Sequence, residues 1–185
     1  MRLSVPPVIH RRRGAAGAVA LLAVAVSVTA AASSAAAPRA RAASAPACTT
    51  AGLVVWLDTN GDGAAGSTNY KLEFTNLSGH SCTLSGYPGV SAVDRAGHQI
   101  GAAAKRDSAT TPHSVTLHSG ASASAATATL RIVDYLNFPR ATCGPTAAAG
   151  LRVYPPNQRA SKLVPFPFGA CSHGADGVLS IRAVS

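Results

Sequence analysis

The segment spanning residues 75–90 places two groups of turn-forming residues and a cysteine between short apolar runs. Just before it, Tyr70, Leu72 and Phe74 alternate with polar residues, which is the period of two that marks a strand with one buried face. Turn-forming residues interrupt the alternation twice, because Asn and Gly tolerate positive φ and Ser hydrogen-bonds its own backbone. Cys82 lies between these two corners. The segment therefore predicts short strands joined by tight turns.

The sequence after Cys48 continues this pattern of short apolar runs separated by Gly, Pro and Asn turns. It predicts about nine short strands, placed at residues 53–57, 70–75, 82–85, 90–94, 115–117, 122–133, 151–154, 164–168 and 177–184. Residues 99–102 are expected to pair back across a turn at 94–97, and polar residues 105–112 are expected to form a loop. Without an internal repeat or an amphipathic helix, the pattern indicates an all-β, immunoglobulin-like antiparallel β-sandwich.

The run at residues 164–168 carries two prolines spaced two residues apart, Pro165 and Pro167. Proline has no N–H for a sheet and is confined to edges, so this run predicts an edge strand protected against pairing with another chain. Val164, Phe166 and Phe168 would then face inward together. The alternative is a polyproline segment that binds an aromatic groove elsewhere. Aromatic residues make up only 5% of the chain, so each, Trp56 included, is expected to contribute to packing.

Residues 1–37 have the organisation of a secretory signal peptide. Four arginines precede an uncharged run at 14–32, and Ala35-Ala36-Ala37 fits a cleavage site, with residues 40–42 as a second candidate. The alternative is an uncleaved anchor, but the run is alanine-rich and ends in cleavage-type residues. We expect a Pro/Ala linker at 38–47, a domain at 48–185, no stable membrane span after cleavage, and a location outside the cell or in its envelope.

The charge does not indicate a nucleic-acid partner. The formal net charge of +9 falls to +5 without residues 1–37, which hold four arginines and no acid. The remaining basic residues are scattered, whereas a nucleic-acid groove needs them clustered beside stacking aromatic residues. We therefore expect a solvated basic surface and no nucleic-acid binding.

Four cysteines, Cys48, Cys82, Cys143 and Cys171, predict two disulfide bonds in an exported chain. Zinc is disfavoured because the cysteines are widely spaced, with no C-x-x-C or H-x-x-x-H pair. Four cysteines allow three pairings, and the sequence alone does not choose among them. Because strands adjacent in sequence are often neighbours, we expect Cys48–Cys82 and Cys143–Cys171.

Two local motifs suggest chemistry, but each is incomplete. The run from Asp58 to Gly63 matches the opening of a calcium loop, yet Asn69 stands where an acidic bidentate ligand is needed. We expect a hairpin-type Asn-Gly or Asp-Gly loop there instead. Gly79-His80-Ser81 resembles the start of a nucleophile elbow, but Thr83 replaces the final glycine and no helix follows. We therefore expect no metal, no cofactor and no catalytic serine.

Several short motifs together resemble a known family. They are Asn76, Cys82-Thr83-Leu84, Gly86-Tyr87-Pro88-Gly89-Val90 and the earlier Gly63-Ala64-Ala65-Gly66. They are similar to secreted actinobacterial domains of unknown function, and the resemblance runs from about Cys48 to the C-terminus. It implies a small disulfide-bonded β-sandwich in the cell envelope or the medium, and it carries over no catalytic residue.

Two classes of function follow from this compartment and fold. The first is a non-enzymatic module that binds an envelope or extracellular protein or polymer through its loops, or that has a structural role. The second is an extracellular hydrolase acting on cell-wall polymer with a carboxylate acid/base pair. The acids are scattered along the chain, and no convergent catalytic set is visible in the sequence. We therefore favour the non-enzymatic module.

Overall fold

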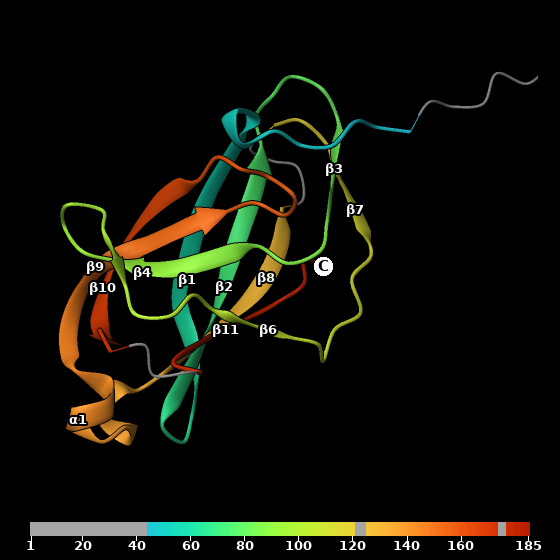
Figure 1. Cartoon of the computed structure of the whole chain (residues 1–185). Helices are drawn as coiled ribbons and strands as arrows, with labels where there is room; N and C mark the ends of the chain where they lie inside the picture. The colour runs from blue at the N-terminus through green and yellow to red at the C-terminus, as the bar shows by residue number, and fades with distance from the viewer. Residues whose placement is uncertain (1–43, 121–124, 174–176) are drawn as a thin grey trace, which may run out of the picture. The chain divides into compact units, whose positions relative to one another are not determined.

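The computed structural model describes residues 44–120, 125–173 and 177–185, which form an all-β sandwich (Figure 1). The expected signal segment, its cleavage site and most of the linker lie outside these residues. The all-β sandwich class with two disulfide bonds is confirmed. Among the described residues, no helix is long and apolar enough to cross a membrane.

Eleven strands occur in the described ranges, and several are longer than the sequence pattern predicts. Their bounds are β1 (Leu53–Ala64), β2 (Ser67–Asn76), β3 (Cys82–Ser85), β4 (Gly89–Val93), β5 (Gln99–Ile100), β6 (Lys105–Asp107), β7 (Ser114–Leu117), β8 (Ala126–Val133), β9 (Pro145–Tyr154), β10 (Lys162–Cys171) and β11 (Leu179–Arg182). Three short helical segments complete the described elements: η1 (Thr50–Gly52), η2 (Tyr135–Asn137) and α1 (Arg140–Cys143).

The strands form two main sheets and one separate pair. The larger sheet has the order β1-β2-β8-β11-β6, and the smaller has the order β10-β9-β4-β5. Strands β3 and β7 pair with each other to one side, at the right of Figure 1. The pairing is antiparallel except where β11 runs parallel to β6. The antiparallel sandwich thus contains one parallel edge pair that the sequence pattern does not predict.

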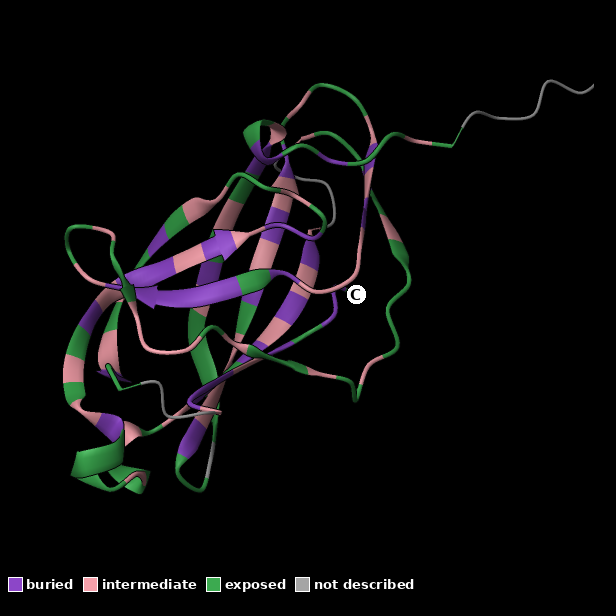
Figure 2. Ribbon diagram, in the orientation of Figure 1, coloured by how far each residue is buried: buried purple, intermediate pink, exposed green. Residues whose placement is uncertain are grey.

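The core lies between the two main sheets and follows the alternation of their strands. Leu72 and Phe74 from β2 are fully buried, as are Leu151 and Val153 from β9. The same alternation appears along the strands as bands of buried and less buried residues (Figure 2). Trp56 is an exception to the expectation for aromatic residues, because 44% of it is exposed on edge strand β1. It sits one position away from buried Leu57, so the alternation directs it outward.

The hairpin between β1 and β2 corrects the expected position of a turn. The Asn-Gly and Asp-Gly pairs of residues 58–63 lie within β1, where the register shifts between Asp58 and Asp62. The turn itself follows at Ala65–Gly66, because Ala64 pairs with Ser67. Gly66 has a φ of 72°, a conformation that glycine adopts without steric cost. A bulge extends the strand through the residues expected to end it.

Polar residues 105–112 are the second correction, because the first three of them form β6 rather than a loop. Lys105 pairs with Ser180, and Asp107 pairs with Arg182. The residues are exposed or half-buried, so they carry no apolar alternation that would reveal a strand. Tertiary pairing with β11 imposes the extended conformation.

Strand β10 is an edge strand, as the two prolines predict. It is the outer member of the order β10-β9-β4-β5 and pairs with β9. Pro165 and Pro167 are exposed, Val164 is buried, and Phe166 and Phe168 are half-buried against the core. The inward-facing set of Val164 and the two phenylalanines is therefore confirmed. The two phenylalanines also reach the surface, which brings them to the candidate site.

Candidate functional site

Two disulfide bonds tie separate parts of the sandwich together. Cys48 bonds Cys82, and Cys143 bonds Cys171. This is the pairing expected from the order of the strands. The first bond holds the segment before η1 against β3, where a parallel bridge also joins Ala47 to Thr83. All four cysteines are buried, so both bonds belong to the core.

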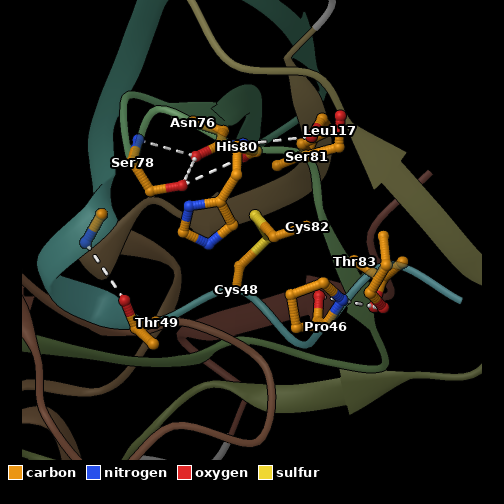
Figure 3. The surroundings of a disulfide bond; sticks show 12 residues. Pro46, Cys48, Thr49, Asn76, Ser78, His80, Ser81, Cys82, Thr83 and Leu117 are labelled. Carbon is orange, nitrogen blue, oxygen red and sulfur yellow. Dashed lines mark hydrogen bonds between the residues drawn. A yellow bond between two sulfur atoms is a disulfide. The ribbon is translucent and has the colours of Figure 1, made fainter. Parts of the chain in front are cut away.

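Next to the first disulfide, one buried amide connects three segments (Figure 3). The Asn76 Nδ2 donates to the carbonyls of His80 at 2.8 Å and Leu117 at 3.1 Å. Its Oδ1 accepts from the backbone N–H of Ser78 at 3.0 Å and from the Ser78 hydroxyl at 2.7 Å. Every hydrogen-bonding position of a side chain that is 99% buried is therefore used at least once. Asn76 fixes the turn after β2 and the end of β7.

The serine of the elbow-like motif has a histidine beside it. Ser81 Oγ lies 3.2 Å from the Nδ1 of His118; Ser81 is half-buried and His118 is exposed. Ser81 precedes β3 and His118 follows β7, so the pair extends the register in which Cys82 faces Leu117. A catalytic serine needs a base that a third group orients. Within the described residues, no carboxylate bonds His118, and the segment is strand-turn-strand instead of strand-turn-helix.

The calcium-like motif places its acids on two sides of a strand bulge. The Asp58 Oδ1 accepts from the backbone and side-chain nitrogens of Asn60, both at 3.0 Å. In the described ranges, no group of three or more His, Cys, Asp and Glu side chains is arranged to hold a metal ion. The Asp58 oxygen is engaged by a local turn in the way that Asp commonly is in loops.

Aromatic side chains converge on the surface where β2, η2 and β10 meet. Tyr70 meets Phe166 edge to face, with ring centroids 5.0 Å apart and an interplanar angle of 67°. Phe166 in turn lies 5.8 Å from Phe168 at 31°. With Tyr135 of η2, these rings line an open hollow of about 410 Å³. A concave surface lined by aromatic residues with a few polar groups is the usual form of a ligand site.

Two glycines make room for the tyrosines of this hollow. A Cβ added to Gly169 would lie 2.2 Å from the Tyr135 Cε1, so the ring rests directly on the β10 backbone. A Cβ at Gly61 would lie 2.7 Å from the Tyr70 Cε1. Asn137 of η2 donates to the Gly66 carbonyl at 2.7 Å, which ties the η2 turn to the hairpin tip. The tyrosines are therefore held in place by backbone contact on at least one side.

The hollow continues along the edge of the smaller sheet. Tyr135, Phe168 and Gly169 also line a second hollow of about 520 Å³, which extends over β9 at Ala147 and Ala148. Residues of β9 and Pro167 are shared with a third hollow of about 680 Å³ that ends at the 94–96 turn. We call the three together the edge groove. It runs from the β1–β2 hairpin tip, past η2, to the turn after β4.

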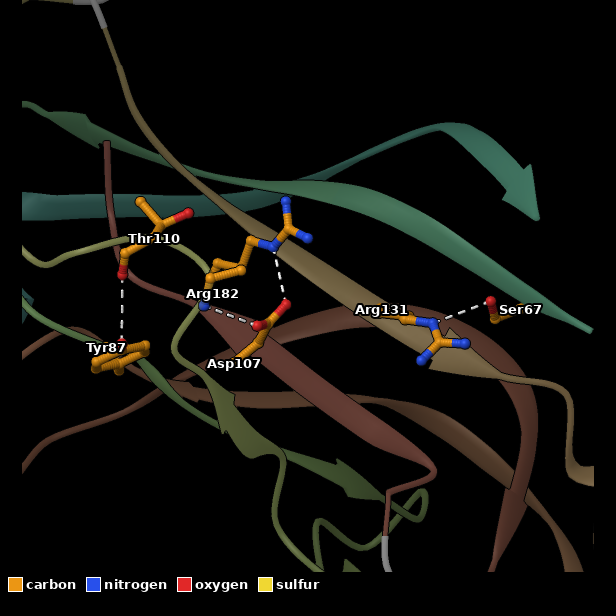
Figure 4. A network of polar contacts seen from close by, with 7 residues as sticks. Ser67, Tyr87, Asp107, Thr110, Arg131 and Arg182 are labelled. Carbon is orange, nitrogen blue, oxygen red and sulfur yellow. Dashed lines mark hydrogen bonds and ion pairs between the residues drawn. The ribbon is translucent and has the colours of Figure 1, made fainter.

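The polar groups of the edge groove are mostly uncharged. In the described structure, the Tyr70 and Tyr135 hydroxyls have no protein partner. Ser67 Oγ accepts from the Arg131 Nε at 3.0 Å (Figure 4), and its hydroxyl proton remains to be donated. Asp134 caps η2 by accepting from the Leu136 N–H at 2.9 Å through one oxygen. The aromatic end of the groove therefore offers hydroxyl groups and one carboxylate oxygen.

A second polar cluster lies on the larger sheet and has a structural explanation (Figure 4). The Arg182 Nε donates to the Asp107 Oδ2 at 2.9 Å, and the Ala109 N–H donates to Oδ1 at 3.0 Å. These bonds, the Arg182 bond above all, hold the pKa of Asp107 below its usual value. Arg106 lies 5.5 Å from the centroid of the Tyr87 ring. The cluster fastens β6 to β11, the pair that runs parallel.

The sequence predicts the pairing of the cysteines in disulfide bonds but does not predict the edge groove. The sequence pattern assigns the aromatic residues of the groove to packing, and it correctly predicts that Phe166 and Phe168 share one face of an edge strand. Their meeting with Tyr70 and Tyr135 depends on the pairing of β9 with β10 and on the η2 turn. One signal was present in the sequence. Gly169 follows Phe168 within a strand, and a glycine inside a strand often marks a place where another group approaches the backbone closely.

Comparisons with known proteins place the chain but give no function. A family described as "Domain of unknown function (DUF4232)" matches residues 48–185. No curated protein and no solved structure matches the chain. The matched range covers both disulfide bonds and the whole edge groove.

Proposed function

The chain belongs to the DUF4232 family of domains of unknown function, and we propose that its domain is a non-enzymatic binding module that works outside the cytoplasm. The observation that carries this proposal is the edge groove. It brings four aromatic rings, exposed hydroxyl groups and small side chains to three adjoining hollows that share lining residues. A partner bound there would be held on rigid strands, with η2 as the only helical contributor among the described lining residues.

The location outside the cytoplasm rests on two independent features. Residues 1–37 have the organisation of a signal peptide, and two disulfide bonds suit an oxidising compartment. The motif at residues 82–90 resembles secreted actinobacterial domains and supports the same location. N-terminal sequencing of exported protein is expected to begin near Pro38 or Ala43. An intact chain recovered only from membranes would contradict cleavage.

The competing hydrolase hypothesis needs two carboxylates in a single cleft. Asp134 lines the aromatic end of the edge groove and Asp94 lines the opposite end. None of the three described hollows contains both acids. The Ser81–His118 pair lies at the β3–β7 ladder instead of in the groove, and its histidine has no orienting acid in the described structure. These observations support binding over hydrolysis.

The test is capture from envelope and culture-medium extracts by the purified exported protein. We expect a partner to be retained by the wild type and lost by Tyr135→Ala and Phe168→Ala, which remove groove rings. Leu163→Ala is the matched control, because it removes an exposed apolar side chain from the same strand β10 outside the groove. Equal capture by all four proteins, or capture by none, would refute the groove as the binding surface.

A further inference from the structure

We propose that the edge groove binds an uncharged glycan chain, an unbranched run of neutral hexose or N-acetylhexosamine units. This inference rests on the proposed binding function and specifies its ligand. It follows from four properties of the groove: the arrangement of its rings, the charge of its lining, the chemistry of its strand edge and its length.

Three of the four rings contact one another directly. Tyr70 contacts Phe166, and Phe166 contacts Phe168, at centroid separations of 5.0 and 5.8 Å. Because each of these rings contacts the next in space, no room remains between them for a quaternary ammonium group, which is bound by a cage of facing rings. The parts of these half-buried rings that face the hollow, together with the Tyr135 ring, offer apolar surface on which C–H faces can pack. Sugar rings present such faces, with hydroxyl groups around their edges.

The charge of the lining excludes an anionic polymer as the favoured ligand. Neither a lysine nor an arginine lines the two hollows that contain Tyr135, and the one arginine of the third hollow, Arg95, lies next to Asp94. Phosphate and carboxylate ligands are ordinarily bound by such cations. The groups that are present are the hydroxyls of Tyr70 and Tyr135, of Ser67 and Thr68, and one oxygen of Asp134. They can donate to and accept from sugar hydroxyl groups, and the carboxylate would repel an anion.

The edge of strand β10 does not favour an extended peptide as the ligand. A peptide that adds to a sheet edge is held by main-chain hydrogen bonds along that edge. Pro165 and Pro167 supply no N–H at two positions of β10, next to the rings. The groove must therefore hold its ligand through side chains. A polyproline peptide, which also docks on aromatic grooves, is the remaining peptide form and is included in the test.

The length of the groove indicates a chain of several units. The hollows of about 410 and 520 Å³ share Tyr135, Phe168 and Gly169, and the second passes over small alanines of β9. Small side chains leave a shallow, open floor that does not block a long ligand. A single sugar would fill only part of this surface, so affinity should rise with the number of units.

The experiment is calorimetric titration of the purified exported protein with defined probes. The probes are cellohexaose, chitohexaose and maltohexaose, their trisaccharides, a polyproline decamer, and polygalacturonate as the anionic polymer. We expect at least one neutral hexasaccharide to bind, more tightly than its trisaccharide, with an affinity that falls about tenfold in Tyr135→Ala. Gly169→Ala should weaken binding too, because its Cβ would displace the Tyr135 ring. Leu163→Ala should bind like the wild type.

Each other result overturns the inference in a distinguishable way. Tighter binding of polyproline or polygalacturonate than of every neutral glycan would reject the glycan as the ligand. If Tyr135→Ala abolished that binding, the groove would still be the binding surface. Failure of every probe would also reject the glycan, while groove-dependent capture from extracts would still stand. Hexasaccharide binding that Tyr135→Ala and Gly169→Ala leave unchanged would place the site elsewhere. Thermal unfolding of each variant distinguishes a loss of binding from a loss of the fold.

Discussion

At the scale of single residues, Asn76 is the most buried of the described polar side chains. It is buried beside the first disulfide and bonds to the carbonyls of His80 and Leu117 and to Ser78. Buried polar groups that are fully paired specify one arrangement of the segments around them, because any other arrangement leaves a polar atom unpaired. The amide thus sets how the turn after β2 meets the β3–β7 pair.

We predict that Asn76→Ala lowers the free energy of unfolding by about 2–4 kcal/mol, because it leaves the buried Leu117 carbonyl without this donor. Urea unfolding followed by fluorescence of Trp56 measures the change. Ser78→Ala is the control: it removes one hydroxyl from the same cluster and should cost about 1 kcal/mol. An Asn76→Ala protein as stable as the wild type would show that the amide network has no energetic role.

Asp107 gives a pH-dependent prediction at the same scale. Its pKa is lowered mainly by the bond from Arg182. A carboxylate with a lowered pKa in the folded state contributes stability that is present above its unfolded pKa, ordinarily about 3.9. That contribution is lost as the pH falls through the lower folded value. Since about a third of the Asp107 side chain is exposed, solvent screening limits the contribution to about 0.5 kcal/mol.

Asp107→Asn should therefore be slightly less stable than the wild type near neutral pH, and the difference should shrink as the pH falls below the unfolded pKa of the carboxyl group. Urea unfolding at several pH values provides the measurement. Asp62→Asn, a change at an exposed acid of β1, controls for the loss of one negative charge. A stability difference that grows as the pH falls would contradict the assigned sign.

At the scale of elements, edge strand β10 combines protection with a binding surface. Its exposed prolines alternate with Phe166 and Phe168. The two phenylalanines line the aromatic end of the groove, and Pro167 lines the second and third hollows. Proline on an edge prevents the strand from pairing with another chain.

We predict that Pro165→Val with Pro167→Thr causes concentration-dependent self-association, because the double variant restores two N–H donors on the edge. Size-exclusion chromatography with light scattering measures the mass. Pro112→Thr, which changes an exposed proline outside any described strand, should leave the mass unchanged. A double variant with the mass of the wild type at every concentration would show that the prolines do not protect the edge.

The disulfide bonds also act on elements, because each fixes a strand to a distant segment. The bonded cysteines are 34 and 28 residues apart. Closing loops of that size stabilises by about 3–4 kcal/mol in the chain-entropy view. We therefore expect Cys48→Ala with Cys82→Ala, and separately Cys143→Ala with Cys171→Ala, to lose about 3 kcal/mol each in urea unfolding. A loss below about 1 kcal/mol would mean that neighbouring contacts hold the segments without the bond.

The strands that the sequence predicts are those whose apolar residues alternate, such as the β2 run with Leu72 and Phe74. Strand β6 was missed because its conformation comes from pairing with β11, and Lys105 and Arg106 carry no apolar signal. The hairpin turn was misplaced because a bulge carries β1 past its turn-forming residues to Ala65–Gly66. Turn-forming residues and apolar alternation can be identified in the sequence, whereas the pairing of strands that are distant in the chain cannot.

The candidate site follows the same rule. The cysteine pairing could be argued from neighbouring strands, but the groove could not, because Tyr70, Tyr135 and Phe168 are far apart in the sequence. They come together only after β9, β10 and η2 are in place. The seating of Tyr135 on Gly169 is likewise a tertiary contact that no pattern in the sequence encodes.

At the scale of the whole molecule, the first disulfide and the edge groove belong to different strands, whereas the second disulfide holds the end of β10, which lines the groove. The β3–β7 pair lies at the right of Figure 1, whereas the tip of the β1–β2 hairpin and α1 lie at the bottom. The edge groove begins at that hairpin tip and follows β9 and β10. A partner can therefore be held on the strand edge without disturbing the segment that leads to the N-terminus.

Hydrogen exchange with mass spectrometry tests this central claim most directly. The exported protein would be compared alone, with a purified envelope-polymer fraction and with an envelope-protein fraction. The account predicts that the fraction that binds slows exchange in peptides covering residues 133–138, 145–149 and 165–169, and that Tyr135→Ala removes this protection. Protection confined to residues 53–57, around exposed Trp56, or to residues 79–83 and 116–119, around Ser81 and His118, would contradict it.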